Sequence, residues 1–221
     1  MESLSSGRCV AVHTPARVET VNPDLTISDW RAELPTLSAR LVTLREPTSQ
    51  DVRALTDLLA IGDACRFGID EPMTARGVQQ FVERIQHDRR VGFGFTYAIT
   101  ISTTRALAGI IQVRQLDPSF EGAEWECVLT PSWRGTGVFL EAARLTGSFA
   151  FAVVGTHRLE SRVLLQNGRA NGALRKLGAV QEGVLRRSVR RGAEYFDQVL
   201  WSVLKEDWGE HWVSSSSLRV H

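Results

Sequence analysis

Two carboxylates in the middle of the chain have the type and spacing for proton-transfer chemistry. Glu124 and Glu126 lie at i and i+2 of a predicted strand that ends near Leu129. Side chains with this spacing share one face of a strand. A carboxylate on such a face can act as a general base, directly or through a water molecule. Alternating charges on a strand also commonly face solvent, so the sequence leaves both interpretations open.

A glycine-containing turn follows this strand directly. Gly135 and Gly137 have no Cβ to block a ligand, and a helix is predicted to begin at Val138. The first turn of a helix has amide groups without intrahelical partners and the positive end of the helix dipole. We therefore expect an anion to bind the backbone of residues 135–140. The G-x-G spacing alone is weak evidence, since a second one occurs at residues 92–94 with no helix after it.

Two common nucleotide-binding motifs are excluded by the residues that follow. Position 140 is Leu, so the dinucleotide fingerprint G-x-G-x-x-G is absent, and no G-x-x-x-x-G-K-[ST] sequence occurs.

The flanking sequence predicts the elements that hold this segment. Upstream, a strand near residues 41–45 precedes a helix that opens at Thr48 and a second helix that starts near Thr74. Two β-rich runs, 93–101 and 106–114, form an expected hairpin.

The downstream half continues the alternation of strands and helices. Residues 157–164 alternate as in a half-buried strand, a short helix runs from Asn167 to a stop at Gly178, and two strands, about 179–189 and 194–204, close the fold. This order predicts an α/β fold with a mixed, mostly antiparallel central sheet and helices on both faces.

Composition restricts the broad class. The chain has 221 residues, 43% hydrophobic residues and a net charge of +1. These values are typical of an ordinary globular protein and give no strong signal for nucleic acid or membrane binding. No apolar run approaches the length that crosses a bilayer, so we expect a cytoplasmic protein. Cys9, Cys65 and Cys127 are odd in number and far apart, which favours free thiols over disulfides or a metal site.

The domain organisation follows from the same patterns. We expect a flexible N-terminal arm over residues 1–37, one domain over 38–208 and a disordered tail over 209–221. Trp30 could attach the end of the arm to the domain. The oligomeric state stays open, with a homodimer as one alternative.

Four ordered stretches resemble one family. The loop Arg134–Phe139 resembles the acyl-CoA pyrophosphate loop Q/R-x-x-G-x-G/A of the GNAT superfamily of N-acetyltransferases, although Phe139 departs from it. The other stretches are residues 40–45, Asn167 with residues 176–178, and residues 182–186 leading to 197–201. Together they resemble the RimJ/RimL-like branch, which acetylates N-terminal amines of ribosomal proteins.

The resemblance implies the fold, the cosubstrate and the reaction. It implies a GNAT-type sheet whose fourth and fifth strands splay apart, with the first two helices framing the acceptor side. Acetyl-CoA would be the cosubstrate, no metal would be needed, and the acceptor would be an amine, with a protein N-terminus favoured over a small molecule. The acetyl group would pass by direct attack in a ternary complex.

The resemblance also implies roles for individual residues. Glu124, ahead of Glu126, would be the base, because this branch has a glutamate at the position that Glu124 matches, and the backbone near Val128 would stabilise the oxyanion. Asn167 would contact CoA or simply cap its helix. The residues implied in cofactor binding are Cys127, Val128, Leu129, Arg134, Gly135, Thr136, Gly137, Val138, Phe139, Leu140 and Asn167.

Two departures from the family keep alternatives open. Many relatives have a Tyr general acid seven residues after the asparagine, where this chain has Leu174, and Phe139 replaces a small residue in the loop. A catalytically inactive acyl-CoA-binding sensor or scaffold is therefore the main alternative function. The basic run 186–191 raises a third hypothesis, an RNA or ribosome binder, or else a contact to the CoA 3′-phosphate.

Overall fold

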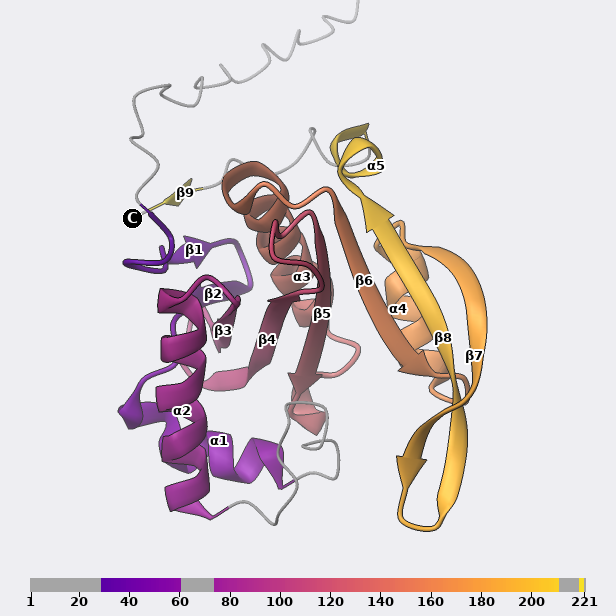
Figure 1. The fold of residues 1–221 in the computed structure, drawn as a ribbon. Helices are drawn as coiled ribbons and strands as arrows, with labels where there is room; N and C mark the ends of the chain where they lie inside the picture. Colours follow the sequence, from indigo (N-terminus) through magenta and orange to yellow (C-terminus); the bar gives the residue numbers. More distant parts are fainter. Residues whose placement is uncertain (1–28, 61–73, 211–218, 221) are drawn as a thin grey trace, which may run out of the picture.

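The computed structural model describes residues 29–60, 74–210 and 219–220, and Figure 1 shows their arrangement. The strands are β1 (Leu37–Ser38), β2 (Val42–Arg45), β3 (Gly94–Ile101), β4 (Leu107–Gln115), β5 (Gly122–Leu129), β6 (Arg158–Leu164), β7 (Val180–Arg191), β8 (Glu194–Leu204) and β9 (Arg219–Val220). The helices are α1 (Val52–Leu59), α2 (Ala75–Arg90), α3 (Val138–Phe149), α4 (Gly168–Lys176) and α5 (Lys205–Glu210).

The described strands form one sheet in the order β7-β8-β6-β5-β4-β3-β2-β1-β9. Every neighbouring pair is antiparallel except β5 and β6, which run parallel. The mixed, mostly antiparallel sheet confirms the predicted fold class, and each strand and helix predicted between residues 41 and 204 is present within a few residues of its predicted bounds.

Helices cover both faces of the sheet. Helices α1 and α2 pack on one face against Ile110 of β4 and Val128 of β5. Helix α3 packs on the other face in the main core, together with Leu174 of α4. In Figure 1, α1 and α2 lie in front of the sheet and α3 and α4 lie behind it.

The predicted helix starts have the expected caps. Thr48 and Asp51 form the capping box before α1, and the Thr74 hydroxyl accepts a hydrogen bond from the Gly77 amide at 3.1 Å. Asn167 caps α4 in the same way, since its Oδ1 accepts from the Ala170 amide at 3.1 Å. These side chains satisfy amides that the first helical turn leaves without partners.

The domain boundary at residue 38 stays a prediction, but the packed part of the chain includes residues before it. Trp30 and Leu34 are buried in the main core, and the Trp30 ring lies edge-on to Phe95 and Phe120, with centroids 5.7 Å apart in each pair. Most of the predicted arm and most of the predicted tail, as well as Cys9 and Cys65, lie outside the described residues.

Candidate functional site

The parallel strands β5 and β6 separate after a short paired stretch. Their pairing covers only Gly122–Glu124 with Arg158–Glu160, although β5 continues to Leu129 and β6 to Leu164. The Ser161 hydroxyl donates to the Trp125 carbonyl at 3.2 Å, just beyond the last pair. Past this point the facing backbone groups of the two strands border a gap, which matches the splayed strand pair expected from the sequence.

A cleft of about 760 Å³ occupies this region. It is bordered by β5, the loop into α3, β6 and α4. Ten predicted site residues line it: Glu126, Cys127, Val128, Leu129, Arg134, Gly135, Gly137, Phe139, Leu140 and Asn167. Glu124, Thr136 and Val138 are the predicted residues that do not line it.

The loop from β5 into α3 has the conformation that its glycines allow. Gly135 has φ +83° and Gly137 has φ +93°, a left-handed region that L side chains rarely adopt. Gly137 is the N-cap of α3, so the amides of the first helical turn follow it directly. The fold therefore presents a helix N-terminus to the cleft, an arrangement that favours an anion.

Arg134 holds this loop against the end of β5. Its Nε donates to the Leu129 carbonyl at 3.0 Å, and the residue is half-buried. A guanidinium has five N–H donors, so Arg134 retains further donors for a ligand at the edge of the cleft. Arg169 and Lys176 of α4 add two more cationic side chains to the lining.

The remaining loop residues have distinct surroundings. The Val138 side chain is buried in the core, so only its backbone is suited to ligand contact. Thr136 is exposed, and its hydroxyl donates to the Trp133 carbonyl at 2.8 Å. Phe139 packs against the main core and also borders the cleft, which lets a bulky residue stand where the family has a small one.

The two candidate bases differ in their contacts. The Glu124 carboxylate lies between Arg114 and Arg162, with 3.4 Å ion pairs to both, and does not line the cleft. Glu126 lines the cleft, and its closest ion-pair distance to Arg114 is 4.0 Å. Of the two carboxylates, Glu126 is therefore the one that borders the cleft, whereas Glu124, the one placed first from the sequence, is held between two arginines.

Backbone alternation along β5 determines which amides near Val128 are turned toward the cleft. The Leu116 amide donates to the Gly122 carbonyl and the Thr130 amide to the Ala108 carbonyl, so the even-numbered residues of β5 bond to β4. The N–H of Val128 is thus turned toward β4. The odd-numbered residues Cys127 and Leu129 direct their backbone groups toward the cleft and are better placed as hydrogen-bond donors to a ligand.

Cys127 is a free thiol at the edge of the cleft. Burial raises the pKa of the Cys127 thiol to about 12. The thiol is therefore protonated at neutral pH and is a weak nucleophile, because the thiolate is the reactive form.

Three residues that sequence analysis missed hold the site together. The Glu141 carboxylate accepts from the amides of Leu41 and Val42, at 2.6 and 2.9 Å, and so ties α3 to β2. The side chain of Asn171 donates through Nδ2 to the Leu164 carbonyl at 3.0 Å. Its Oδ1 accepts from Trp201 Nε1 at 2.8 Å. Ser161 bridges the strands at the splay. The sequence signal for Asn171 was an asparagine inside a predicted helix, where its propensity is poor.

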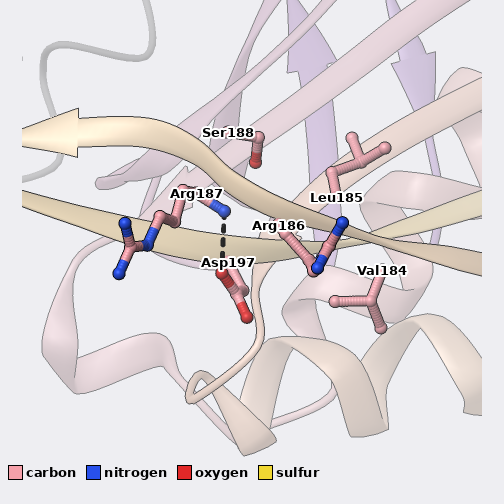
Figure 2. A pocket seen from close by; sticks show the side chains of 6 residues that line it. All are labelled: Val184, Leu185, Arg186, Arg187, Ser188 and Asp197. Atoms are coloured by element: carbon pink, nitrogen blue, oxygen red, sulfur yellow. Dashed lines mark hydrogen bonds between the residues drawn. The ribbon is translucent and has the colours of Figure 1, made fainter.

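The basic run 186–191 lies elsewhere, on β7. Figure 2 shows Arg186 and Arg187 beside Asp197, whose carboxylate accepts from the Arg187 amide at 2.7 Å. Pairing of β7 with β8 is interrupted here, between Leu185 and Val189. Arg186, Arg187 and Ser188 of this run border a separate cavity of about 900 Å³, whose lining includes none of the residues that line the cleft.

Neither a membrane-spanning helix nor a cluster of metal ligands occurs in the described part of the chain. No helix in the described ranges is long and apolar enough to cross a membrane. Within the same ranges, no group of three or more His, Cys, Asp or Glu side chains could hold a metal ion.

Comparison with known proteins gives consistent matches. The family model of the acetyltransferase (GNAT) domain matches residues 41–180. The spermidine N(1)-acetyltransferase of Escherichia coli K12 is 24% identical over 176 residues, covering 79% of this chain and 92% of that protein. A probable N-acetyltransferase of Bacillus subtilis 168, YjcK, is 25% identical over 130 residues, which are 59% of this chain and 70% of that protein.

Solved structures show the same fold. The ribosomal-protein-S5-alanine acetyltransferase of Vibrio fischeri superimposes with a TM-score of 0.67 at 17% identity, covering 78% of this chain and 98% of that one. The spermidine N-acetyltransferase of Vibrio cholerae, in complex with CoA and spermine, also gives 0.67, at 18% identity and with 77% and 99% coverage. Both likenesses concern the fold.

Proposed function

The chain belongs to the GNAT acetyltransferase family and is an acetyl-CoA-dependent N-acetyltransferase, and we propose that its acceptor is the N-terminal amine of a protein. The observation that carries the site assignment is the cleft between the splayed ends of β5 and β6, which ten predicted residues line. The proposal for the acceptor rests on the four ordered motifs that resemble the RimJ/RimL-like branch.

The cleft suggests how acetyl-CoA is held. Its pyrophosphate would lie on the amides of residues 135–140, next to the Arg134 guanidinium, where charge-assisted hydrogen bonds are strong. Its pantetheine would run along the backbone of Cys127 and Leu129 in place of a paired strand. Asn167 uses its oxygen as a helix cap, so its amide group is suited to donate to the cosubstrate.

The chemistry requires a neutral amine beside the thioester. We propose that Glu126 takes the proton of the amine, directly or through a water molecule, as the amine attacks from the face covered by α1 and α2. The backbone N–H of Cys127 or Leu129 would stabilise the oxyanion. The raised pKa of the Cys127 thiol, about 12, supports direct transfer to the amine over an acyl-cysteine intermediate.

The CoA thiolate needs no dedicated acid in this scheme. Leu174 is buried at the position where many relatives have Tyr, and a leucine has no proton to donate. A free thiol has a pKa near 8.5, about one to two units above neutral, so solvent can protonate the departing thiolate.

The test combines binding and turnover. Acetyl-CoA is titrated calorimetrically into the purified chain, and thiol release is then followed with N-terminal peptides and with spermidine, the acceptor named for the E. coli relative. Peptide-dependent thiol release with a higher kcat/KM than spermidine supports the proposal. Preference for spermidine overturns the acceptor assignment, and binding without amine-dependent release favours the sensor alternative.

A further inference from the structure

Six charged side chains form a continuous row of ion pairs across the sheet, which we call the charge ladder. The ladder begins on β4, crosses β5 and β6 and ends on β7: Arg114, Glu124, Arg162, Glu160, Arg158 and Glu182. Successive N–O distances are 3.4, 3.4, 3.7, 2.9 and 2.7 Å. Positive and negative groups therefore alternate from β4 to β7, with side chains from four strands and with β8 lying between β6 and β7.

The ladder lies on the face of the sheet that α1 and α2 also occupy. Strand register aligns Ile110 with Val128 and Arg114 with Glu124, and residues two apart on a strand share a face. Ile110 and Val128 pack against α1 and α2, which fixes the face. In Figure 1 this side of β5, β6 and β8 is turned toward the viewer.

Exposure differs systematically between the two signs of charge near the cleft. The Glu124 and Glu160 side chains are only 12% and 17% exposed, whereas those of Arg114 and Arg162 are 33% and 40% exposed. The two guanidinium side chains thus reach further into solvent than the carboxylates with which they pair.

These two arginines stand on the strands next to the one that carries the proposed base. Arg114 also approaches Glu126 at 4.0 Å, and Glu126 lines the cleft. Glu124 lies two residues before Glu126 on β5, and its partner Arg162 lies on β6. These are the two strands that separate to form the cleft. Both arginines therefore stand on strands that flank β5, on the face from which the amine is proposed to approach.

We infer that Arg114 and Arg162 set acceptor specificity by disfavouring polycationic amines and favouring an amine whose neighbouring groups are neutral or acidic. The inference rests on the proposed function, because it assigns the charge class of the acceptor at the same site. Like charges that meet near a desolvated site repel, and such repulsion is a common means of rejecting wrong partners.

The test measures selectivity in the full-length chain. The kcat/KM is determined for spermidine and for two N-terminal peptides that differ only in having acidic or lysine residues after the first position. The variants are R114Q, R162Q and their double variant. R90Q is the matched control, because Arg90 is an exposed arginine at the end of α2, outside the ladder.

The expected result is a shift in ratio rather than a general loss. The wild type should prefer the acidic peptide, and each glutamine variant should raise the ratio of spermidine to acidic-peptide kcat/KM about tenfold, which corresponds to about 1.4 kcal/mol. R90Q should leave the ratio unchanged. R162K keeps the charge and should retain most of the wild-type selectivity.

A measurement on the wild type alone covers the case in which the variants fold poorly. Raising the salt from about 0.05 M to about 0.5 M should shrink the difference between the acidic and the basic peptide, because salt screens exposed charges. Salt-independent selectivity, or a double variant that folds and keeps the wild-type ratio, overturns the inference. A wild type that turns over no amine overturns the proposed function itself, so the two failures are distinguishable.

Discussion

Replacing Gly135 by alanine isolates the anion-binding turn from the rest of the fold. Gly135 has φ +83°, and a Cβ at this position would meet no atom within 4 Å. The cost of the alanine is therefore backbone strain, about 1–2 kcal/mol in the left-handed region. Because the residue is exposed, the loop can relax out of this conformation, and the relaxation moves amides that should face the pyrophosphate. The dissociation constant of acetyl-CoA should rise about five- to thirtyfold.

Gly155 provides a control with the same strain in another place. It has φ +91°, a Cβ added there would also meet no atom within 4 Å, and the residue does not line the cleft. The G155A variant should lose a comparable amount of stability, a fall in Tm of about 2–4 °C per kcal/mol for a chain of this size. Its acetyl-CoA affinity, measured by the same calorimetric titration, should match the wild type.

Two outcomes would refute this reasoning. A folded G135A variant that binds acetyl-CoA within about twofold of the wild type would mean that the turn does not hold the ligand. An equal loss of affinity in G155A would mean that the effect comes from general destabilisation.

The remaining predictions concern other contacts. C127A should keep kcat within about twofold in thiol-release assays, since the Cys127 thiol, with a pKa of about 12, is protonated at neutral pH; loss of turnover would instead indicate a covalent role. N171A should lower the free energy of unfolding by about 1–3 kcal/mol in denaturant titrations, because Trp201 Nε1 and the Leu164 carbonyl lose a buried partner. Hydrogen bonds from Arg158 and Ser202 lower the pKa of Glu182 from 4.5 to about 2, so the stability it contributes is present above pH 4.5 and is lost as pH falls toward about 2. E182Q should therefore show a smaller fall in Tm over this pH range, and an unchanged profile would contradict the assignment.

Much of the fold could be predicted because its signals are local. The capping residues Thr48, Thr74 and Asn167 open the predicted helices in the structure, since a cap acts on amides two or three residues away. The turn at Gly135 and Gly137 is likewise local, because positive φ at two nearby positions needs glycine at both.

The choice between the two glutamates could not be made from the sequence. Both stand on one face of β5; what separates them is that Glu126 borders the cleft, whereas Glu124 lies between two arginines that β4 and β6 contribute. Arg114 and Arg162 are ten and thirty-eight residues from Glu124 in the chain. Their convergence depends on sheet order, which no local pattern encodes.

The sequence by itself determined the elements, the loop that resembles an acyl-CoA site and the family, because these depend on short-range spacing and on ordered motifs. Only the tertiary structure decided which backbone groups of β5 face the cleft, which carboxylate borders it and which charges an acceptor meets. These properties arise from the register of β5 against β4 and from its early separation from β6, and both are relations between segments that are distant in the chain.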